Sequence, residues 1–571
     1  MTGTASIPPT VLLTTDFDEI DRAIASLHSH RDRWVETRIS QRLAYLQDCL
    51  DRTQDIAAAW ATAGCEAKGI APESTLAGEE WITGPISTVR NMRLLMTTLE
   101  ANGQLTPPKI YQRQDGQFVA EILPANAIDR LLYLGYRGEV WLKPETPVTQ
   151  GKIYRESTTG KVALVLGAGN VSSIVALDIL SKLFSENQVV IVKMNPANAY
   201  IGKYLAQAFA PLIQAGFLHI VYGGVDVGEY LCQHPQVETI HITGSHRTHD
   251  AIVWGATVSE QQQRKAANQP RLTKPVTSEL GCVTPIIVVP GKWSQADLTF
   301  QARQVASTIS NNASFNCVSG QILVTSSGWA QQAEFLAAVR RELATIPPRQ
   351  AYYPGAQDRY QAFLDHYPQA EALGARTPEI VPWTIISDVP PVAGEYALTE
   401  EAFCGILAQV SLAEPLGTSI ESDSAPNFLI EAVDFVNDRV WGTLSCTVLI
   451  DPNTQQQYYQ EFDNAIANLQ YGAIGVNIWS GMIFYFGSTT WGAYPGNTPA
   501  DIGSGTGFVH NSYLFDHPQK SVVYAPFRIF PTPAWFANHK NLLSMAKQLL
   551  KLEANPTWRN LPLVVLAALR G

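Results

Sequence analysis

Several features that define large classes of proteins are missing from this sequence. The seven cysteines are scattered and odd in number, and none forms a C-x-x-C pair, so neither a disulfide framework nor a zinc site is indicated. No basic segment offsets the net charge of −11, and we expect no nucleic-acid partner. No uninterrupted apolar stretch is long enough to span a membrane, and the first residues do not follow the pattern of a secretory signal. The sequence predicts a cytoplasmic protein.

The composition is typical of a large globular protein. Hydrophobic residues make up 46% and charged residues 16% of the 571 residues, and a chain of this length is expected to divide into at least two hydrophobic cores. Apolar residues recur at helical spacing in the N-terminal part, whereas short alternating segments broken by proline and glycine follow from about residue 117. The N-terminal part is therefore expected to be helical, with strands and turns after it.

Strand-like and helix-like segments alternate most clearly between residues 161 and 245. The runs KVALVLGAGN, QVVIVKM, HIVYGG and VETIHITGS are separated by helical patterns at the spacing of a parallel sheet. Such a sheet binds ligands at the carboxyl ends of its strands, and three of these runs lead into GAGN, KMNP and TGS. We expect a site where those ends meet. A second α/β segment extends to about residue 465, and an aromatic, proline-rich and finally helical element ends the chain.

Cys317 lies in an unusual local sequence. A structural cysteine is normally surrounded by apolar packing partners, and taken singly this is the commoner role for an intracellular cysteine. Cys317 instead lies in NNASFNCVSGQ, among asparagine, serine and glycine, just before a strand-like run. These neighbours favour a thiol at the mouth of a site.

Four motifs occur in a fixed order along the chain: GAGN with Asn170, TSELGC with Glu279, FNCVSGQ with Cys317 and TEEAFCGIL with Glu401. Together with VIVKMNP, ITGS and the later IGVN and FYFGS segments, they make the sequence resemble the aldehyde dehydrogenase superfamily between about residues 115 and 490. Each motif alone is weak, and their common order carries the resemblance.

The resemblance implies an α/β fold with two doubly wound parallel-sheet domains and a small oligomerisation arm. Residues 1–116 and 151–283 are expected to form the NAD(P)-binding domain, 117–150 the strand arm, and 284–470 the catalytic domain. The segment 471–571 is expected to close the site and to carry an aromatic and helical extension. In the family the arm pairs with a neighbouring subunit, so a homo-oligomer, either a dimer or a tetramer, is expected.

The resemblance also assigns a chemistry. Cys317 is the expected nucleophile toward a small-molecule aldehyde, because a thiolate attacks a carbonyl readily. The side-chain amide of Asn170 and the backbone N–H of Cys317 are expected to stabilise the oxyanion. Glu279 matches the general base that activates water against the resulting thioester. The implied activity is that of an NAD(P)-dependent aldehyde dehydrogenase, with a carboxylic acid as product.

The expected cofactor, NAD or NADP, has matching residues as well. Lys193 and Glu401 match positions that hydrogen-bond the ribose hydroxyl pairs, and Phe403 matches an aromatic beside the nicotinamide. The turn that approaches the pyrophosphate at a helix N-terminus corresponds to Thr243, Gly244 and Ser245. No metal is assigned, because neither a carboxylate nor a cysteine stands at ligand spacing from His241, His246 and His249, which are expected to be solvated or hydrogen-bonded.

Four positions depart from the family pattern. Pro196 stands where many NAD-preferring members have a glutamate, so the choice between NAD and NADP stays open. Phe315 replaces a glutamine, Cys282 replaces a glycine, and His249 takes a glycine position in the helix turn after TGS. These substitutions place bulk near the cofactor and the nucleophile.

Two alternative functions follow from these departures. In a CoA-dependent acyl reductase, CoA instead of water would meet the thioester, but a hydrolytic base such as Glu279 would destroy that thioester. The other alternative is a catalytically inactive binding or structural relative. The substrate stays open, although several aromatics near the FYFGS segment favour an apolar aldehyde, namely Trp479, Phe484, Tyr485 and Trp491.

Overall fold

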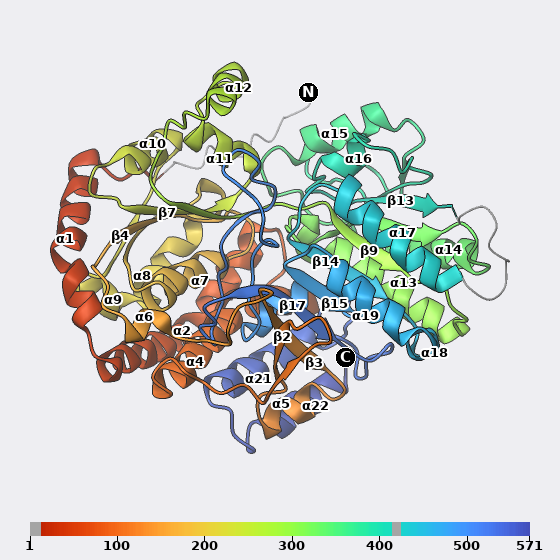
Figure 1. Ribbon diagram of the computed structural model, residues 1–571, viewed down its shortest axis with the longest axis horizontal. Helices are drawn as coiled ribbons and strands as arrows, with labels where there is room; N and C mark the ends of the chain where they lie inside the picture. The colour runs from red at the N-terminus through yellow and green to blue at the C-terminus, as the bar shows by residue number, and fades with distance from the viewer. Residues whose placement is uncertain (1–12, 414–423) are drawn as a thin grey trace.

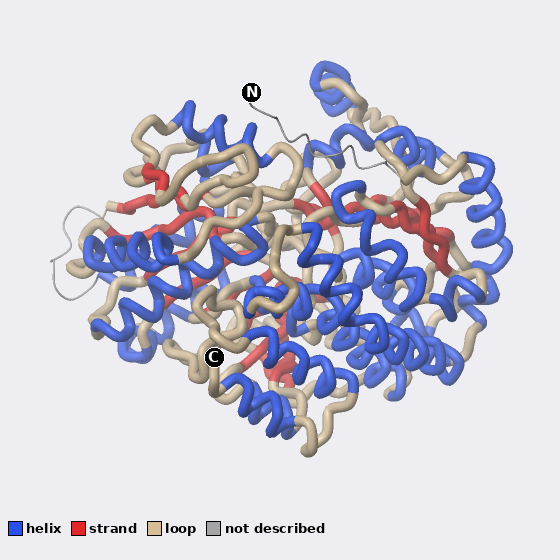
Figure 2. Tube along the Cα trace, turned by 180° about the vertical axis from the view of Figure 1, so that it is seen from behind, coloured by secondary structure: helices blue, strands red, loops and turns tan. Residues whose placement is uncertain are grey.

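Two β-sheets lie side by side and form the frame of the molecule (Figure 1). The computed structural model describes residues 13–413 and 424–571. A six-stranded sheet occupies the left of the view, and an eleven-stranded sheet extends toward the right. Helices pack over the strands of both sheets, as the view from behind also shows (Figure 2). The predicted α/β fold with parallel sheets is confirmed.

The smaller sheet is built from the alternating segment that the sequence predicts. Its order is β16-β8-β7-β4-β5-β6, with β16 antiparallel at one edge and the other strands parallel. Every residue of the run VALVL is buried, because helices cover both faces of such a sheet. The strands are β4 (Val162–Leu166), β5 (Val189–Lys193), β6 (Leu218–Val221), β7 (Thr239–Gly244), β8 (Val276–Leu280) and β16 (Gly505–Thr506).

Helices from the N-terminal part and from between these strands flank the smaller sheet. Asp16 caps the first helix by accepting a hydrogen bond from the Asp18 N–H at 2.9 Å. The α-helices are α1 (Phe17–Glu36), α2 (Ile39–Ala67), α3 (Gly78–Trp81), α4 (Ser87–Glu100), α6 (Lys152–Arg155), α7 (Ile174–Leu180), α8 (Gly202–Ala208), α9 (Ala210–Gln214), α10 (Val225–Gln233), α11 (His246–Val253) and α12 (Val258–Ala267). Shorter turns are η1 (Thr75–Ala77), η2 (Ile82–Ile86), η3 (Ser181–Ser185) and η4 (Pro196–Ile201). In the described part of the chain, no helix has both the length and the apolar character needed to cross a membrane.

The larger sheet has the order β1-β2-β3-β17-β15-β14-β9-β10-β13-β12-β11. The strands from β17 to β12 are parallel, and antiparallel strands flank them at both ends. Its strands are β1 (Lys109–Gln112), β2 (Phe118–Leu123), β3 (Arg137–Leu142), β9 (Thr284–Val288), β10 (Gly320–Ser326), β11 (Glu371–Ala372), β12 (Thr384–Ile386), β13 (Ile406–Leu412), β14 (Ser445–Leu449), β15 (Ala473–Val476) and β17 (Pro518–Tyr524). Around it lie α13 (Gln295–Ser310), η5 (Asn311–Ser314), α14 (Gln332–Thr345), α15 (Ala356–His366), α16 (Tyr396–Thr399), α17 (Ser424–Arg439), α18 (Pro452–Gln457), α19 (Tyr459–Asn468) and α20 (Gly481–Phe486).

The strands of segment 117–150 join the larger sheet of the same chain. β2 pairs with β3, and β3 pairs with β17 of the C-terminal segment, so that Val140 lies opposite Ser521. A short helix, α5 (Ala127–Leu132), connects β2 to β3, and Asn126 caps it. β1 forms the outer edge and is largely exposed. Within residues 13–413 and 424–571, no further strand covers that edge.

The C-terminal extension folds back onto the N-terminal helices. α21 (Leu542–Ala554) and α22 (Leu561–Ala568) pack together at the lower end of the molecule, near α5 (Figure 1). Glu553 on α21 accepts hydrogen bonds from Arg90 at 2.6 Å and from Arg93 at 2.5 Å, both on α4. Because Arg90 and Glu553 are buried, this ion pair ties the extension to the helical N-terminal part.

Candidate active site

Cys317 lies just after a strained turn that connects α13 to β10. Three consecutive residues in this turn have positive φ angles: +50° at Asn312, +54° at Ala313 and +69° at Ser314. Asparagine tolerates this left-handed region better than most residues, which accounts for an amide here. Alanine and serine held there cost about 1–3 kcal/mol each, and such a backbone persists only where surrounding contacts fix it. Contacts from outside the turn must therefore hold it.

Residues of the N-terminal helices provide these contacts. Glu79 accepts a hydrogen bond from the Asn312 backbone N–H at 2.8 Å and pairs with Arg349 at 2.9 Å. Lys68 donates to Glu80 at 2.8 Å and to Oδ1 of Asn312 at 3.0 Å, within the protein interior. Sequence reasoning missed these residues, because nothing local connects positions that are 233 residues apart.

The thiol of Cys317 faces the carboxylate of Glu279. Sγ lies 3.3 Å from Oε1 of Glu279, at hydrogen-bonding distance. Glu279, on β8, is buried, whereas Cys317 is partly accessible. Burial, and next the negative charge of Asp178, raise the pKa of Glu279 to about 7. Burial of the sulfur, and next Glu279, raise the pKa of Cys317 well above that of an ordinary thiol. The proton therefore rests on sulfur until a reaction draws it to the carboxylate.

Asn170 approaches the same turn from the smaller sheet. It follows β4, and its Nδ2 donates to the carbonyl oxygen of Phe315 at 3.0 Å. An amide nitrogen carries two protons, so the second proton is free to meet another acceptor. The ring of Phe315 is buried, with centroids 5.7 Å from Tyr353 and 6.0 Å from Phe403. The bulk of this departure from the family pattern therefore packs into an aromatic cluster.

Lys193 and Thr243 lie at the carboxyl edge of the smaller sheet. Lys193 ends β5 opposite Leu166 of β4, and Leu166 lies opposite Ile242 of β7. The next residue of β7, Thr243, lies opposite Glu279 of β8. Nearly the same level across the sheet is therefore shared by Lys193, Thr243 and Glu279. A site at the strand ends requires this alignment.

The turn after β7 presents backbone groups to its surroundings. Gly244 is exposed, and Ser245 caps α11 by accepting a hydrogen bond from the Thr248 N–H at 3.2 Å. The side chain of Thr243 points elsewhere, since its Oγ1 donates to Asp178 at 2.9 Å. N–H groups at a helix N-terminus favour anions, so the turn suits a phosphate through its backbone.

Glu401 lies close to the end of β8. Its Oε1 accepts a hydrogen bond from the Cys282 N–H at 3.2 Å, and its carboxylate lies against Gly281, where any side chain would collide with it. Removal from water raises the pKa of Glu401 to about 8, and Glu279 adds to this effect. Cys282 itself is fully buried and directs its bulk into the core. Phe403, two residues on, packs its ring 5.1 Å from that of Tyr353.

Comparison with known proteins finds similarity to one family. A model described as the aldehyde dehydrogenase family matches residues 148–357, the range that contains Asn170, Glu279 and Cys317. This part of the chain is similar to the aldehyde dehydrogenase family. A curated relative from Staphylococcus haemolyticus that is named as an aldehyde dehydrogenase is 26% identical over 170 residues. That match covers 29% of this chain and 32% of the relative, about a third of its length.

Solved structures of the superfamily share the fold at low sequence identity. Aldehyde dehydrogenase 21 from Physcomitrella patens, in complex with the reaction product succinate, has a TM-score of 0.61 at 15% identity, over 89% of this chain and 90% of that chain. Aldehyde dehydrogenase KauB from Pseudomonas aeruginosa has a TM-score of 0.60 at 16% identity, over 89% of both chains. NADP-dependent glyceraldehyde-3-phosphate dehydrogenase from Bacillus halodurans C-125, complexed with NADP, has a TM-score of 0.58 at 15% identity, over 89% and 92%.

A buried polar chain lies behind Glu279. His241 lies 3.4 Å from Asp178 through Nε2 and 3.0 Å from Thr277 Oγ1 through Nδ1, and Lys182 donates to the same hydroxyl at 3.0 Å. His241 is therefore hydrogen-bonded, one of the two expected environments. Asp178 was missed as a site residue; a sign in the sequence is that Asp178 and Lys182 interrupt an otherwise apolar helix.

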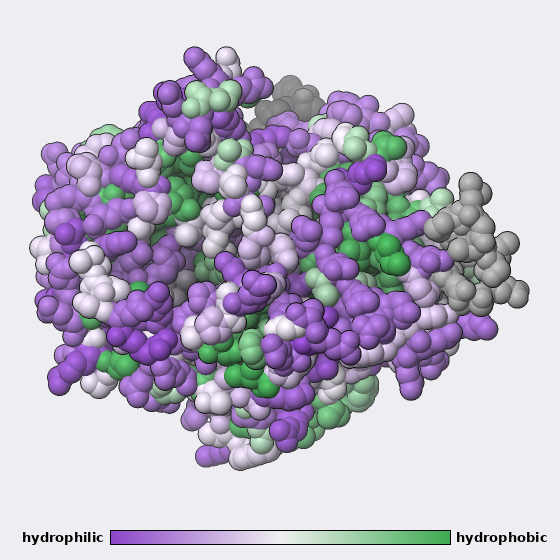
Figure 3. Space-filling model, viewed as in Figure 1, coloured by the Kyte–Doolittle hydropathy of each residue, from purple (hydrophilic) through white to green (hydrophobic). Residues whose placement is uncertain are grey.

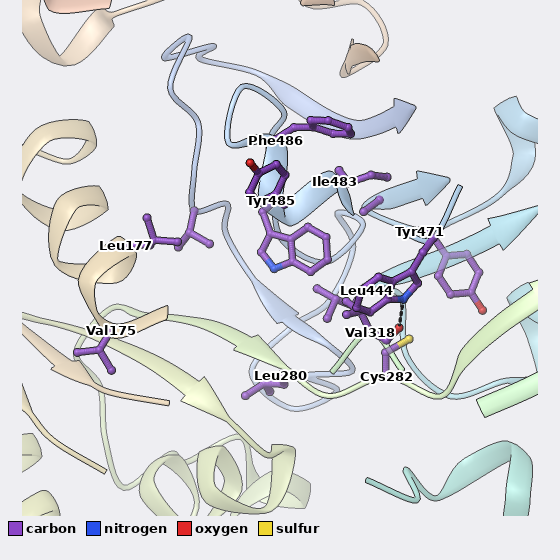
Figure 4. Packing of buried hydrophobic residues seen from close by; sticks show 14 of the residues in the cluster. Val175, Leu177, Leu280, Cys282, Val318, Leu444, Tyr471, Ile483, Tyr485 and Phe486 are labelled. Carbon is purple, nitrogen blue, oxygen red and sulfur yellow. Dashed lines mark hydrogen bonds between the residues drawn. The ribbon is translucent and has the colours of Figure 1, made fainter. Parts of the chain in front are cut away.

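The C-terminal segment supports the other side of the cysteine. Nε1 of Trp479 donates to the carbonyl oxygen of Val318, the residue after Cys317, at 2.8 Å. Figure 4 shows Val318 beside Cys282 and Leu444, with this hydrogen bond dashed. Hydrogen bonds therefore hold the backbone both before and after Cys317.

A cavity of about 390 Å³ leads from Cys317 to the surface. Its inner end is formed by Asn311, Asn316 and Cys317. The aromatic residues that favour an apolar aldehyde also line it: Trp479, Phe484, Tyr485 and Trp491. Its outer part is formed by the turn after α5, the loop 529–535, and helices α21 and α22. The C-terminal extension, which the sequence left without a role, therefore forms a wall of this cavity.

Proposed function

We propose that the chain oxidises an aldehyde to a carboxylic acid, with NAD or NADP as the electron acceptor. The observation that carries the proposal is the contact between Glu279 and Cys317, the residue that lines the cavity. A thiol beside a carboxylate with a pKa near neutrality combines a nucleophile with the base that receives its proton. An aldehyde that enters the cavity meets Cys317, with Glu279 directly behind the thiol.

The first step forms a bond between Sγ of Cys317 and the carbonyl carbon. As the C–S bond forms, the thiol proton passes to Glu279, and negative charge develops on the former carbonyl oxygen. The free amide proton of Asn170 and the backbone N–H of Cys317 are the donors for this oxygen. Loss of one such donor costs about 2.7–4 kcal/mol of transition-state stabilisation.

The carboxyl edge of the smaller sheet fits a dinucleotide. Its strand ends lie at one level, and an exposed glycine precedes a helix N-terminus there. When bound, the dinucleotide supplies the two-electron oxidation that converts the thiohemiacetal into a thioester. The residues that would hold it are Lys193 and Glu401 at the ribose hydroxyls, Thr243, Gly244 and Ser245 at the pyrophosphate, and Phe403 beside the nicotinamide. Pro196 supplies no carboxylate for a ribose, so both NAD and NADP are candidates.

In the last step, Glu279 activates water against the thioester. Glu279 first releases to solvent the proton that it took from the thiol. Its carboxylate then draws a proton from the water as the oxygen attacks the acyl carbon, the C–S bond breaks, and the carboxylic acid is released. The thiolate of Cys317 then regains a proton. One glutamate thus serves both the formation and the hydrolysis of the acyl-enzyme.

The test is an absorbance assay for reduced nicotinamide. Purified protein is mixed with NAD or NADP and a panel of aldehydes, with and without CoA. Turnover in water alone is the expected result. Strict dependence on CoA would replace hydrolysis by acyl transfer and favour the acyl reductase. Absence of turnover, together with no cofactor binding by calorimetry, would favour a binding protein on an inherited fold.

A further inference from the structure

We infer that the substrate of this site is a long, unbranched aliphatic aldehyde that carries no charged group. This inference rests on the proposed function and goes beyond it by naming the substrate class. It is carried by the chemistry of the cavity wall, by the size of the cavity, and by the exposed residues at its mouth.

The wall of the cavity offers no positive charge. No lysine, arginine or histidine of the described residues lines it, and its one ionisable acid, Glu79, already pairs with Arg349. An aldehyde with a distal carboxylate or phosphate would therefore lie in an apolar wall without a counter-ion, which is unfavourable. The buried atoms on the wall that lack hydrogen-bond partners are Oη of Tyr485 and Nε1 of Trp491 and Trp535. All three are neutral donors and do not change this preference.

The arginine that lies behind the wall already has hydrogen-bond and ion-pair partners within the protein. Arg90 places its guanidinium 5.8 Å from the ring centroid of Tyr133 and 5.7 Å from that of Tyr485, and both rings line the cavity. Its Nε donates to the Phe486 carbonyl at 2.9 Å, and its Nη1 donates to Glu553 at 2.6 Å. Arg90 is thus neutralised by a buried carboxylate and stays outside the cavity, where it cannot select an acidic substrate.

The cavity is too large for a short or single-ring aldehyde to fill. An apolar cavity of about 150 Å³ accommodates one benzene ring, whereas this cavity has a volume of about 390 Å³. A single ring at Cys317 would leave the outer wall in contact with water. An extended alkyl chain would instead reach the side chains that α21 and α22 contribute, such as Leu549 and Val564.

Apolar side chains continue the wall beyond the mouth. Phe530 is 83% exposed and Leu134 is 74% exposed, and both line the cavity. On α22, Val565 lines the cavity and is 38% exposed. Figure 3 shows hydrophobic residues at the lower end of the molecule, where Figure 1 places α22. A substrate with a long tail would cover part of this surface, which a short substrate leaves in water.

A chain-length series tests the inference. Initial rates are measured with butanal, hexanal, octanal, decanal and dodecanal, with succinic semialdehyde as a charged probe and benzaldehyde as a ring probe. Each added methylene is expected to raise kcat/KM by about fourfold until the cavity is filled. Equal values across the series, or a preference for either probe, would overturn the inference while leaving aldehyde oxidation intact.

Two variants on one helix sharpen the test. Val564 is buried in the wall, whereas Leu566 is 53% exposed and outside it. Val564→Trp should lower kcat/KM for decanal at least tenfold and leave kcat/KM for butanal nearly unchanged. Leu566→Trp should leave kcat/KM for both aldehydes unchanged. At the mouth, Phe530→Glu should lower kcat/KM for decanal but not for butanal. Trp558→Glu alters an exposed residue outside the cavity and should leave both values unchanged. Equal losses of kcat/KM for butanal and decanal would contradict the conclusion that these wall residues contact a long alkyl chain.

A binding measurement separates this inference from the proposed function. If no aldehyde is oxidised, oxidation is disproved, and the substrate class is judged by calorimetry on Cys317→Ser protein with 1-butanol, 1-octanol and 1-dodecanol. Affinity should again rise about fourfold for each methylene. Equal or undetectable binding of all three alcohols would overturn the inference.

Discussion

Sγ of Cys317, which lines an apolar cavity, lies 3.3 Å from Oε1 of Glu279. The pKa values of both groups are raised, chiefly by burial, so the resting pair carries its proton on sulfur. The reactivity of the thiol therefore depends on the protonation state of a neighbouring carboxylate rather than on a low pKa of its own.

Alkylation should distinguish Cys317 from the other cysteines. Cys317 is partly accessible, and the other six are buried, so iodoacetamide should label Cys317 first and abolish activity. Labelling should be slower than that of a free thiol, because the raised pKa leaves little thiolate. Peptide mass spectrometry locates the label. Cys317→Ala protein should lose oxidation but still bind the cofactor, and full activity in that variant would rule out the thiol mechanism.

Activity should rise with pH through the pKa of Glu279. Glu279 acts as a base only when deprotonated, and its pKa is raised to about 7, chiefly by burial. The kcat/KM should therefore fall below pH 7 and level off above pH 8, in an assay that follows reduced nicotinamide across this range. Asp178 contributes to the raised value, so Asp178→Asn should move the midpoint to lower pH. A midpoint that does not move would assign the titration to another group.

The buried ion pair of Glu553 should hold the C-terminal extension in place. Burial alone would raise the pKa of Glu553, but Arg90 and Arg93 hold this pKa below its ordinary value. The carboxylate of Glu553 is therefore charged. Glu553→Ala leaves buried guanidinium groups unpaired and should lower the free energy of unfolding by about 3–5 kcal/mol. Glu371→Ala, which breaks an exposed pair with Arg340, should cost less than about 1 kcal/mol. Chemical denaturation measures the free energy of unfolding of both variants. Equal losses would show that the buried ion pair of Glu553 contributes little to stability.

The protein should assemble into a dimer or tetramer. β1 is the outer edge of the larger sheet, and its exposed backbone groups are a template for a neighbouring subunit. Light scattering at micromolar concentration should show the oligomer, and Ile110→Pro on β1 should shift it toward the monomer. Leu569→Pro, beyond the end of α22, serves as the control. A wild-type monomer would contradict the assignment of segment 117–150 to assembly.

Much of the frame and the central residues could be predicted from local sequence. Strand runs such as VALVL are buried throughout, and GAGN and TGS stand at strand ends, so the sheet and the position of these turns at one edge follow from short patterns. Cys317 and Glu279 were likewise identified by motifs of a few residues, and the structure brings their side chains together.

The remaining features depend on contacts between distant segments. Glu79 holds Asn312 across 233 residues, and Arg90 meets Glu553 across 463 residues, which no periodicity or motif reveals. For the same reason the pairing of β3 with β17 and the place of α22 in the cavity wall could not be foreseen. The raised pKa of Glu279 also depends on a buried neighbour, Asp178, that belongs to another strand-helix unit.

The most direct test of the central account is the Glu279→Gln variant in rapid-mixing experiments with NAD or NADP and an aldehyde. The acyl-enzyme should form and fail to hydrolyse, which gives a burst of reduced nicotinamide of about one equivalent per site and an acyl group on Cys317 by mass spectrometry. Glu371→Gln, on the exposed surface, should turn over like the wild type. If Glu279→Gln instead shows normal steady turnover in water, with neither a burst nor a trapped acyl group, the pairing of Cys317 with Glu279 is not the catalytic device.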